Sequence, residues 1–488
     1  MIKKVYIVFI LTLLILLSSD IKILADSYNY TPLETVIESA ESMSVTKVID
    51  NSNFLNQNNQ RSTYQFGELK DVFVYEDKIF VSDATNNIIY ELNTSYQLVD
   101  TFPKQDLDEE EQSYYNLNQP NGLYAFDDKL YVADTENQRI VVFDIYSKEI
   151  IMTISDPQDP TFDNRLFKPL KITVDRTGRM FVIALDVFEG IMDFNSDGSF
   201  SRFYGTNVVT MSFFEALIYR FSSEEQRQKQ ALKLQTSFTN LDIDEYGYVY
   251  TVSRPDNENT IKKINFKGQD VLNRNGYVNP VGDVVYLSEN QGGLGASNLV
   301  DVAVSPNGLM YSVLDETRGR IFTYDNEGNL LYIYGELGDR STMFSSPQSL
   351  AYYEDRVIVV DSLNHSIIVF EPTNFGDLIN QAISYYSQAK YSEAKILWEE
   401  VLALNSNYFL AYNGIGKSQL REGDYQSAIK NLKLGNDNYN YSKAFENARN
   451  EKLDIYLPYM LGFGFVLIGY LFYKSMKNAL QREGEEDE

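Results

Sequence analysis

The chain has 488 residues, a formal net charge of −27 at pH 7, no cysteine and one histidine. Its length allows a domain of about 300 residues and a second, smaller domain. The negative charge excludes a nucleic-acid-binding protein, which needs a basic surface. Without cysteine the chain has no thiol nucleophile, and a single histidine cannot build a zinc site from imidazoles.

The N-terminal segment predicts export. Residues 1–25 contain Lys3 and Lys4, the apolar run VYIVFILTLLILL and a short polar stretch that ends at Ala25. This order is typical of a secretory signal peptide with cleavage after Ala25, and an uncleaved membrane anchor is the alternative. Residues 26–68 follow as an N-terminal segment.

Residues 69–372 repeat one pattern: an apolar run that ends in Asp, a polar turn with Asn, and a second apolar run. The clearest copies read KIFVSDATNNIIYELN at 78–93, KLYVADTENQRIVVFD at 129–144 and RVIVVDSLNHSIIVFE at 356–371, and looser copies occupy 179–195, 248–265 and 309–325. One more apolar run precedes each copy, and another follows most of them. Four short strands joined by tight turns make one propeller blade. The predicted fold class is therefore mainly β, with a six-bladed β-propeller over 69–372.

The last copy lacks a fourth run, because the chain turns through Pro372 and Gly376 into a helical pattern. The segment MSVTKVID at 43–50 has strand character and no hairpin partner of its own. We therefore expect residues 43–50 to supply the missing strand and close the ring, since an open propeller would leave sheet edges unpaired.

The repeated pattern of V-x-D, polar residues, N-x-x-I and an apolar strand resembles the NHL repeat, most clearly around Asp83, Asp134 and Asp361. At the aligned position the weaker copies carry Ala184, Ser253 and Leu314. The resemblance implies a six-bladed propeller with binding roles. The three Asp residues are interpreted as caps of the following turn, and a carboxylate ring that binds a metal cation in the central channel is the alternative.

Residues 207–236 interrupt the junction between the third and fourth copies. An apolar cluster comes first and SSEEQ follows from Ser222, which predicts a helix start with acidic residues in its first turn. The cluster consists of Phe213, Phe214, Leu217 and Tyr219. The predicted helical insertion either covers the channel mouth, offers a docking surface, or packs on its own blades.

Residues 375–455 have a helical period and repeat at an offset of 34 residues. The matched pairs are Ala382 with Gly416, Tyr391 with Tyr425, and Ala394 with Ala428. This offset is the length of a tetratricopeptide repeat, which the module resembles. The resemblance implies packed helix pairs with small residues at their close approaches and Trp398 in the core. Ser406 replaces the usual Pro, and we expect residues 441–455 to form a third or capping helix.

Residues 456–473, YLPYMLGFGFVLIGYLFY, form an uncharged stretch with tyrosines near its ends. Its length predicts a single transmembrane helix with aromatic belts. Lys474, Lys477 and Arg482 follow at once and indicate the cytoplasmic side. The sequence thus predicts a single-pass cell-membrane protein with extracellular N-terminal domains. The tail at 474–488 is then cytoplasmic, and its acidic end at 483–488 is expected to be irregular.

The order of these parts resembles bacterial membrane-bound NHL-repeat proteins, some of which look associated with transporter components. The resemblance implies an extracellular binding and scaffold protein without cofactor or catalytic residues. Its expected partners are proteins, transporter components among them. The lack of cysteine and the abundance of Asn, Ile, Tyr and Lys also favour a bacterial source.

The alternative function is a propeller lactonase that uses a carboxylate-bound divalent metal, because six-bladed propellers of this kind include such enzymes. Asp71, Asp242 and Asp301 lie on the first strands of their copies, but strand alternation leaves open which way they point. An enzyme is expected to bring carboxylates and amides together at one channel mouth. A scaffold is expected to show scattered, solvated ones.

Overall fold

The computed structural model describes residues 27–104, 114–155, 157–162, 165–205, 238–254 and 259–486. The predicted signal peptide at 1–25 and the predicted helical insertion at 207–236 lie outside these residues, so both stay predictions. The chain divides into two compact units, one up to Asp377 and one from Leu378. Each unit is described by itself.

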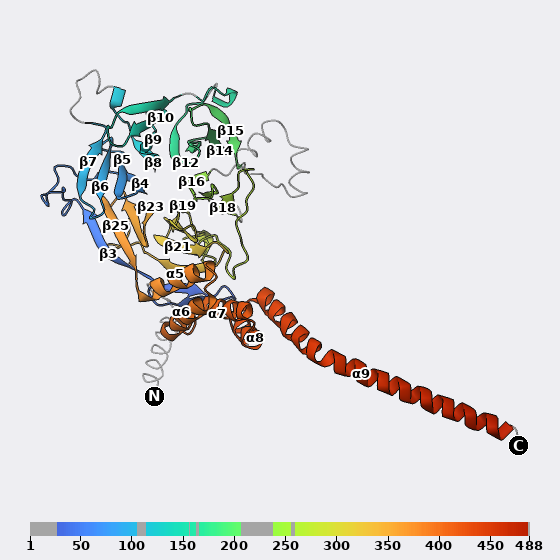
Figure 1. Cartoon of the computed structure of the whole chain (residues 1–488). Coiled ribbons are helices and arrows are strands. Elements are labelled where there is room, and N and C mark those ends of the chain that lie inside the picture. The colour runs from blue at the N-terminus through green and yellow to red at the C-terminus, as the bar shows by residue number, and fades with distance from the viewer. Residues whose placement is uncertain are drawn as a thin grey trace, which may run out of the picture. The chain divides into compact units, whose positions relative to one another are not determined.

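Six antiparallel sheets form a ring, which is the predicted six-bladed β-propeller (Figure 1). The first blade comprises β4 (Leu69–Tyr75), β5 (Lys78–Asp83), β6 (Ile88–Asn93) and β7 (Leu98–Phe102). The second comprises β8 (Pro120–Phe126), β9 (Lys129–Asp134), β10 (Arg139–Asp144) and β11 (Ile150–Ile154). The third comprises β12 (Pro169–Val174), β13 (Met180–Ala184), β14 (Ile191–Phe194) and β15 (Phe200–Tyr204). The fourth blade comprises β16 (Phe238–Ile243), β17 (Val249–Ser253) and β18 (Ile261–Ile264). The fifth comprises β19 (Leu299–Val304), β20 (Met310–Asp315), β21 (Arg320–Asp325) and β22 (Leu330–Tyr334). The sixth comprises β23 (Pro347–Tyr353), β24 (Arg356–Asp361), β25 (Ser366–Pro372) and β3 (Met43–Asp50).

The N-terminal strand β3 closes the ring. It pairs with β25 in antiparallel register from Asp50 opposite Ser366 to Met43 opposite Pro372. The predicted closure by residues 43–50 is therefore confirmed. Its physical basis is that β25 would otherwise present an unpaired edge of backbone N–H and C=O groups.

Two features of the propeller were not expected from the sequence. The fourth blade has three strands in the part of the chain that the structure describes, and only an isolated bridge between Ile264 and Asp270 continues it. A hairpin of β1 (Tyr28–Tyr30) and β2 (Val36–Glu38) precedes β3. The hydroxyls of Tyr28 and Tyr30 both donate to Asp283 Oδ1, at 2.6 and 2.7 Å, which fixes this hairpin to the fifth blade.

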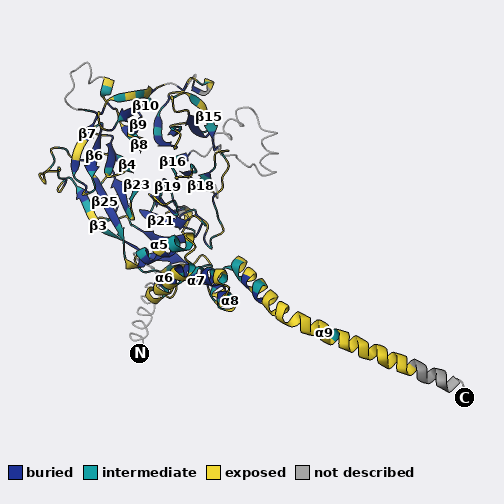
Figure 2. Cartoon of the chain, viewed as in Figure 1, coloured by how far each residue is buried: buried dark blue, intermediate teal, exposed yellow. Residues whose placement is uncertain are grey.

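The apolar core lies between neighbouring blades and not within one blade. One cluster joins Ile49 of β3, Leu69 and Ile88 of the first blade and Ile367 of the sixth, and all four are buried. Both faces of a blade are covered, so the strands read as nearly continuous apolar runs. Figure 2 shows the resulting burial around the ring. Each blade therefore depends on its neighbours for stability.

The second unit begins within α5 (Asn374–Ser387) and continues as α6 (Tyr391–Leu404), α7 (Phe409–Glu422) and α8 (Tyr425–Leu434). The predicted small residues lie where helices approach: Ala394 and Ala428 are fully buried. A Cβ added to Gly416 would lie 2.6 Å from Leu432 Cγ, which is too close for any larger residue. Trp398 is buried, as expected for a core residue.

Helix α9 (Asn438–Glu486) differs from the sequence-based prediction. It runs without a break through the expected capping helix at 441–455, the expected membrane span at 456–473 and the tail. The expectation of an irregular acidic end is wrong for residues 483–486, because the tail is rich in helix-forming residues. Pro458 lies inside the helix and removes a single backbone hydrogen bond.

The apolar middle of α9 has the composition and length to cross a membrane. The stretch Asn438–Asn478 contains an 18-residue window of mean hydropathy 1.8, and no part of that window is buried within the protein. In Figure 2 this helix is exposed along most of its length. A long apolar helix that no protein surface covers needs a lipid or protein environment.

Candidate functional site

A polar cavity of about 240 Å³ occupies the centre of the propeller. Its wall comes from the first strands of the blades, and each of these strands begins with a β-bulge. The residues just after the bulge that line the cavity are Asp71, Lys171, Asn240, Asp301 and Ser349. Strand alternation alone did not show which way Asp71 and Asp301 point. The bulge directs both side chains into the channel.

Lys171 and Asn240 are cavity residues that sequence reasoning missed. They occupy the bulge-following position of the third and fourth blades, so an alignment of the first strands would have found them. In the second blade the equivalent residue is Gly122, where an added Cβ would lie 2.6 Å from Lys171 Cα. The missing side chain there leaves room for Lys171.

Asp71 is the most fully paired carboxylate of the channel. Its Oδ1 accepts from the Ser349 hydroxyl at 2.6 Å and lies 2.8 Å from Lys171 Nζ. Its Oδ2 accepts from the Leu123 N–H at 2.7 Å. Asp71 and Lys171 therefore form a buried, neutral pair that joins the first and third blades.

Asp242 and Asp301 connect neighbouring first strands. Asp242 Oδ2 on β16 accepts from the Val304 N–H on β19 at 2.8 Å, and Asp301 Oδ2 on β19 accepts from the Leu350 N–H on β23 at 2.7 Å. Burial raises the pKa of Asp242 to about 6 and that of Asp301 to about 7. The negative charge of Asp71 contributes to both raised pKa values, while Lys171 lowers the pKa of Asp301.

These two pKa values predict a pH-dependent stability. Both carboxyls hold a proton more tightly in the folded chain than in the unfolded chain, where the pKa of Asp is about 3.9. Their contribution to stability is therefore fully present below that value and is lost as the pH rises toward about 7. In chemical denaturation between about pH 5.5 and 8, the wild type should lose more stability than Asp301→Asn. Equal losses in the two proteins would contradict this assignment.

The three Asp residues of the NHL-like motif lie away from the cavity and are fully buried. Asp83 Oδ1 accepts from the N–H groups of Thr85 and Asn86, at 3.1 and 3.0 Å, and Asp361 Oδ1 accepts from those of Leu363 and Asn364, at 3.1 and 2.9 Å. Asp134 Oδ2 accepts from Arg139 Nε at 2.7 Å and Asn137 Nδ2 at 2.8 Å. All three also accept from the segment that enters their own blade.

The fifth blade carries a fourth Asp of this kind, so the alignment with Leu314 was wrong. Asp315 pairs with Leu299 and Arg320, as Asp83 pairs with Leu69 and Ile88. It accepts from the N–H groups of Asn298 and Thr317 at 2.9 and 3.0 Å. The sequence VLDETRGR lacks the Asn of the clearer copies, which shifted the sequence alignment by one residue.

We expect Asp361→Ala to destabilise the propeller without changing its channel. The variant would leave buried N–H groups without an acceptor, and each such group costs about 1–3 kcal/mol. Asp355→Ala, at an exposed turn position of the same blade, is the matched control and should melt as the wild type does. Thermal unfolding measures the difference, and an unchanged melting temperature for Asp361→Ala would overturn the capping role.

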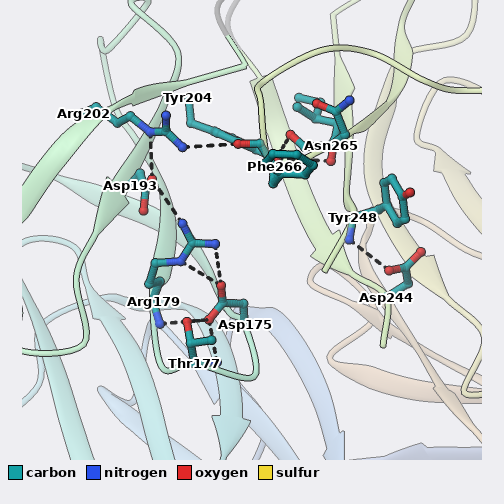
Figure 3. Close-up of polar contacts among 11 residues, drawn as sticks. Asp175, Thr177, Arg179, Asp193, Arg202, Tyr204, Asp244, Tyr248, Asn265 and Phe266 are labelled. Carbon is teal, nitrogen blue, oxygen red and sulfur yellow. Dashed lines mark hydrogen bonds and ion pairs between the residues drawn. The ribbon is translucent and has the colours of Figure 1, made fainter. Parts of the chain in front are cut away.

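A second polar network ties the third blade to the fourth (Figure 3). Arg179 Nε donates to Asp175 at 2.9 Å, and Arg202 Nε donates to Asp193 at 3.1 Å. Arg202 Nη2 also donates to the Phe266 carbonyl of the fourth blade at 3.3 Å. These charges are paired with each other, so the network holds the two blades together.

The part of the chain that the structure describes shows no metal centre built from His, Asp and Glu side chains. No group of three or more His, Asp or Glu side chains lies close enough there to share one ion. The single histidine, His365, lies in the turn of the sixth blade, where its Nδ1 is 2.6 Å from the Gly67 carbonyl oxygen. Carboxylates and an amide do meet in the central cavity, where Asp71, Asp242, Asp301 and Asn240 lie. Their side-chain oxygens accept hydrogen bonds from backbone N–H groups.

Comparison with known proteins supports the propeller. The sequence profile of the NHL repeat matches residues 117–143, which lie in the second blade. No curated protein matches the chain. Among solved structures, the Cps50 (Swd1) β-propeller domain of Myceliophteria_thermophila is similar at 8% identity and a TM-score of 0.40, covering 68% of this chain and 100% of that one.

A structural genomics protein of unknown function from Bacteroides thetaiotaomicron is similar at 12% identity and a TM-score of 0.44, covering 68% of this chain and 76% of that one. Likenesses at these TM-scores carry no conclusion about function. The chain is a six-bladed β-propeller with an NHL repeat in its second blade, followed by helices.

Proposed function

We propose that this protein is a membrane-anchored binding and scaffold protein whose propeller docks a partner protein through one face. The observation that carries the proposal is the uneven distribution of exposed apolar side chains over the two propeller faces. Apolar side chains that gather on one surface mark interaction sites, whereas scattered ones are normal.

The two faces follow from the strand order. Connections between second and third strands lie at one end of the blades, together with the segments that lead to the next blade; we call this the long-loop face. The other connections lie at the opposite end, because successive antiparallel strands reverse direction. Exposed large apolar residues on the long-loop face are Tyr114, Leu166, Leu185, Val285, Tyr286, Leu287, Leu294, Leu337 and Leu363. The opposite face has Tyr146, Tyr246 and Phe266.

Five of these residues lie in two segments that contact Arg318 of the fifth blade; we call Val285, Tyr286, Leu287, Leu294 and Leu337 the blade-five patch. Arg318 holds the segments that carry them. Its guanidinium lies 5.9 Å from the Tyr286 ring, and it donates to the Gly295 carbonyl. Its own carbonyl accepts from the Leu337 N–H at 3.2 Å. Aromatic residues and arginine are enriched in protein interfaces, and this surface contains both.

The helical unit supports a second interaction in the same proposal. Its helix pairs repeat at 34 residues, as in tetratricopeptide-like modules, and small residues set their packing. In its more specific form, the proposal is that the protein is bacterial and that both units lie outside the cytoplasm. Its partners are then transporter components of the same membrane. This form rests on the resemblance of the whole chain and on the apolar stretch of α9.

A pair of matched double variants tests the docking face. Leu287→Glu with Leu294→Glu adds two charges to the blade-five patch, and Tyr246→Glu with Phe266→Glu adds two charges to the opposite face. In cross-linking of the tagged full chain in its own membrane, the first variant should lose a membrane protein that the second retains. Both variants should melt as the wild type does. Retention of every cross-linked protein by the first variant would contradict the proposal, as would cross-links to the chain itself alone.

The lactonase alternative is not part of this proposal. It requires a divalent metal held by carboxylates, and no group of three or more His, Asp or Glu side chains among the described residues supports such a site. The channel carboxylates accept from backbone N–H groups and from Lys171, so their positions are explained by blade contacts. We therefore assign no catalytic residue.

A further inference from the structure

The central cavity holds two carboxylates that are less fully paired than Asp71, which lies against Lys171. Asp242 has no ion pair among the described residues and accepts from the backbone N–H groups of Ile243 and Val304. Asp301 accepts from the N–H groups of Val302 and Leu350, and it also interacts with the Ser349 hydroxyl and with the charge of Lys171. Each carboxylate oxygen has two lone pairs, so each can accept a further donor. The cavity therefore offers two acidic side chains with free acceptor positions, which an ammonium group would favour in their ionised form.

Asn240 has a hydrogen-bond donor that lacks an acceptor. It occupies the bulge-following position of its strand, as Asp301 does. Its Oδ1 accepts from the Leu241 N–H at 2.7 Å, which fixes the orientation of the amide. Its Nδ2 therefore points away from that contact and has no hydrogen-bond partner, although the residue is only 3% exposed. A buried donor without an acceptor costs about 1–3 kcal/mol, so this group requires an explanation.

The wall between these groups includes aromatic rings. Phe73 and Tyr124 line the cavity and lie two residues beyond the bulge-following position, on the same level as Asp242. Their ring centroids are 4.5 Å apart. Aromatic faces stabilise organic cations, and carboxylates add charge complementarity. Glu245 and Pro306 also line the cavity and lie in turns between first and second strands, so it reaches the face opposite the long-loop face.

We propose that the channel binds a small organic ammonium compound that carries a hydrogen-bond acceptor next to its nitrogen. The ammonium group donates to Asp242 and Asp301 and lies against the aromatic wall. The neighbouring oxygen accepts from Asn240 Nδ2. A bare metal ion satisfies the carboxylates but leaves Asn240 Nδ2 without an acceptor, and no group of three suitable ligands exists among the described residues. This site is independent of the blade-five patch.

Matched probes test the charge requirement directly. Ethanolamine is compared with ethylene glycol, and glycinamide with glycolamide, since each pair differs mainly in an ammonium group that replaces a hydroxyl. Isothermal titration of the full chain in detergent should give saturable binding for the ammonium member of each pair only. Equal binding of both members, or no binding of either ammonium probe, would overturn the proposal.

Variants then assign the site. Asp301→Asn removes one charge, and ethanolamine should bind it at least about tenfold more weakly because a buried charge pair is lost. Asn240→Ala removes the unpaired donor and should also weaken binding while the protein folds normally. Asp127→Asn removes an exposed charge outside the channel and should bind as the wild type does. If folded Asn240→Ala and Asp301→Asn both bind like the wild type, the ammonium compound does not occupy this cavity.

Discussion

Deletion of residues 43–50 is expected to unfold the propeller and not merely to shorten the N-terminal segment. Strand β3 covers the outer edge of β25 along seven residue pairs. Without it, that edge presents unpaired backbone groups and the sixth blade loses its link to the N-terminal segment. Ile49 is also lost from the core cluster that joins the first and sixth blades. In a closed ring each blade depends on both neighbours, so the loss spreads beyond one blade.

Circular dichroism during heating of the purified full chain measures this result. The deletion should abolish the cooperative transition of the propeller. Ile49→Ala should lower stability by about 2–5 kcal/mol, the usual cost of truncating a buried isoleucine. Thr46→Ala, at an exposed position of the same strand, is the matched control and should leave the transition unchanged.

A disulfide provides a direct check on the pairing. Val48 lies opposite Ile368, and the chain contains no other cysteine, so Val48→Cys with Ile368→Cys should cross-link on oxidation. The oxidised form should melt higher than the reduced form, because the link closes a very long loop. Failure of the two thiols to cross-link, together with normal melting of the deletion variant, would refute the closure.

Two arginines in the apolar stretch of α9 are expected to release the protein from the membrane. A Cβ added at Gly464 would meet no atom within 4 Å beyond the adjacent backbone of its own helix, and Leu467 is exposed, so neither substitution disturbs a protein contact. Gly464→Arg and Leu467→Arg should each cost about 2.5–3.5 kcal/mol of insertion free energy near the helix centre. The double variant should therefore appear in the soluble fraction, and in the medium if the chain is exported.

Gly464→Ala with Leu467→Met keeps this stretch apolar and should remain in the membrane fraction. Protease added to intact cells without their wall then tests the orientation. The tagged tail at 474–488 should be protected while the propeller is cleaved. Protection of the propeller instead would place it in the cytoplasm and would exclude extracellular partners. Membrane retention of the double arginine variant would show that α9 does not anchor the protein.

The sequence alone determined the parts of this protein that depend on local pattern. Alternating apolar runs with polar turns predicted the six blades, because strand periodicity and turn residues act over a few positions. The unpaired strand character of 43–50 predicted the closure, since a strand without a local partner has to find a distant one. The offset of 34 residues likewise predicted paired helices with Tyr391 and Tyr425 in equivalent places, which the sequence assigned to the turns and the structure shows as the first residues of α6 and α8.

Tertiary structure decided what depends on register and on distant partners. Alternation could not show which way Asp71 and Asp301 point, because a bulge at the start of each first strand adds one residue and reverses the faces. Asp315 was missed for a different reason, because its turn lacks the Asn that aligned the clearer copies. The channel exists only when first strands of different blades meet, so the unpaired Nδ2 of Asn240 and its neighbouring carboxylates had no signal in any single repeat. Their chemistry comes from burial between blades, and burial is a property of the assembled ring.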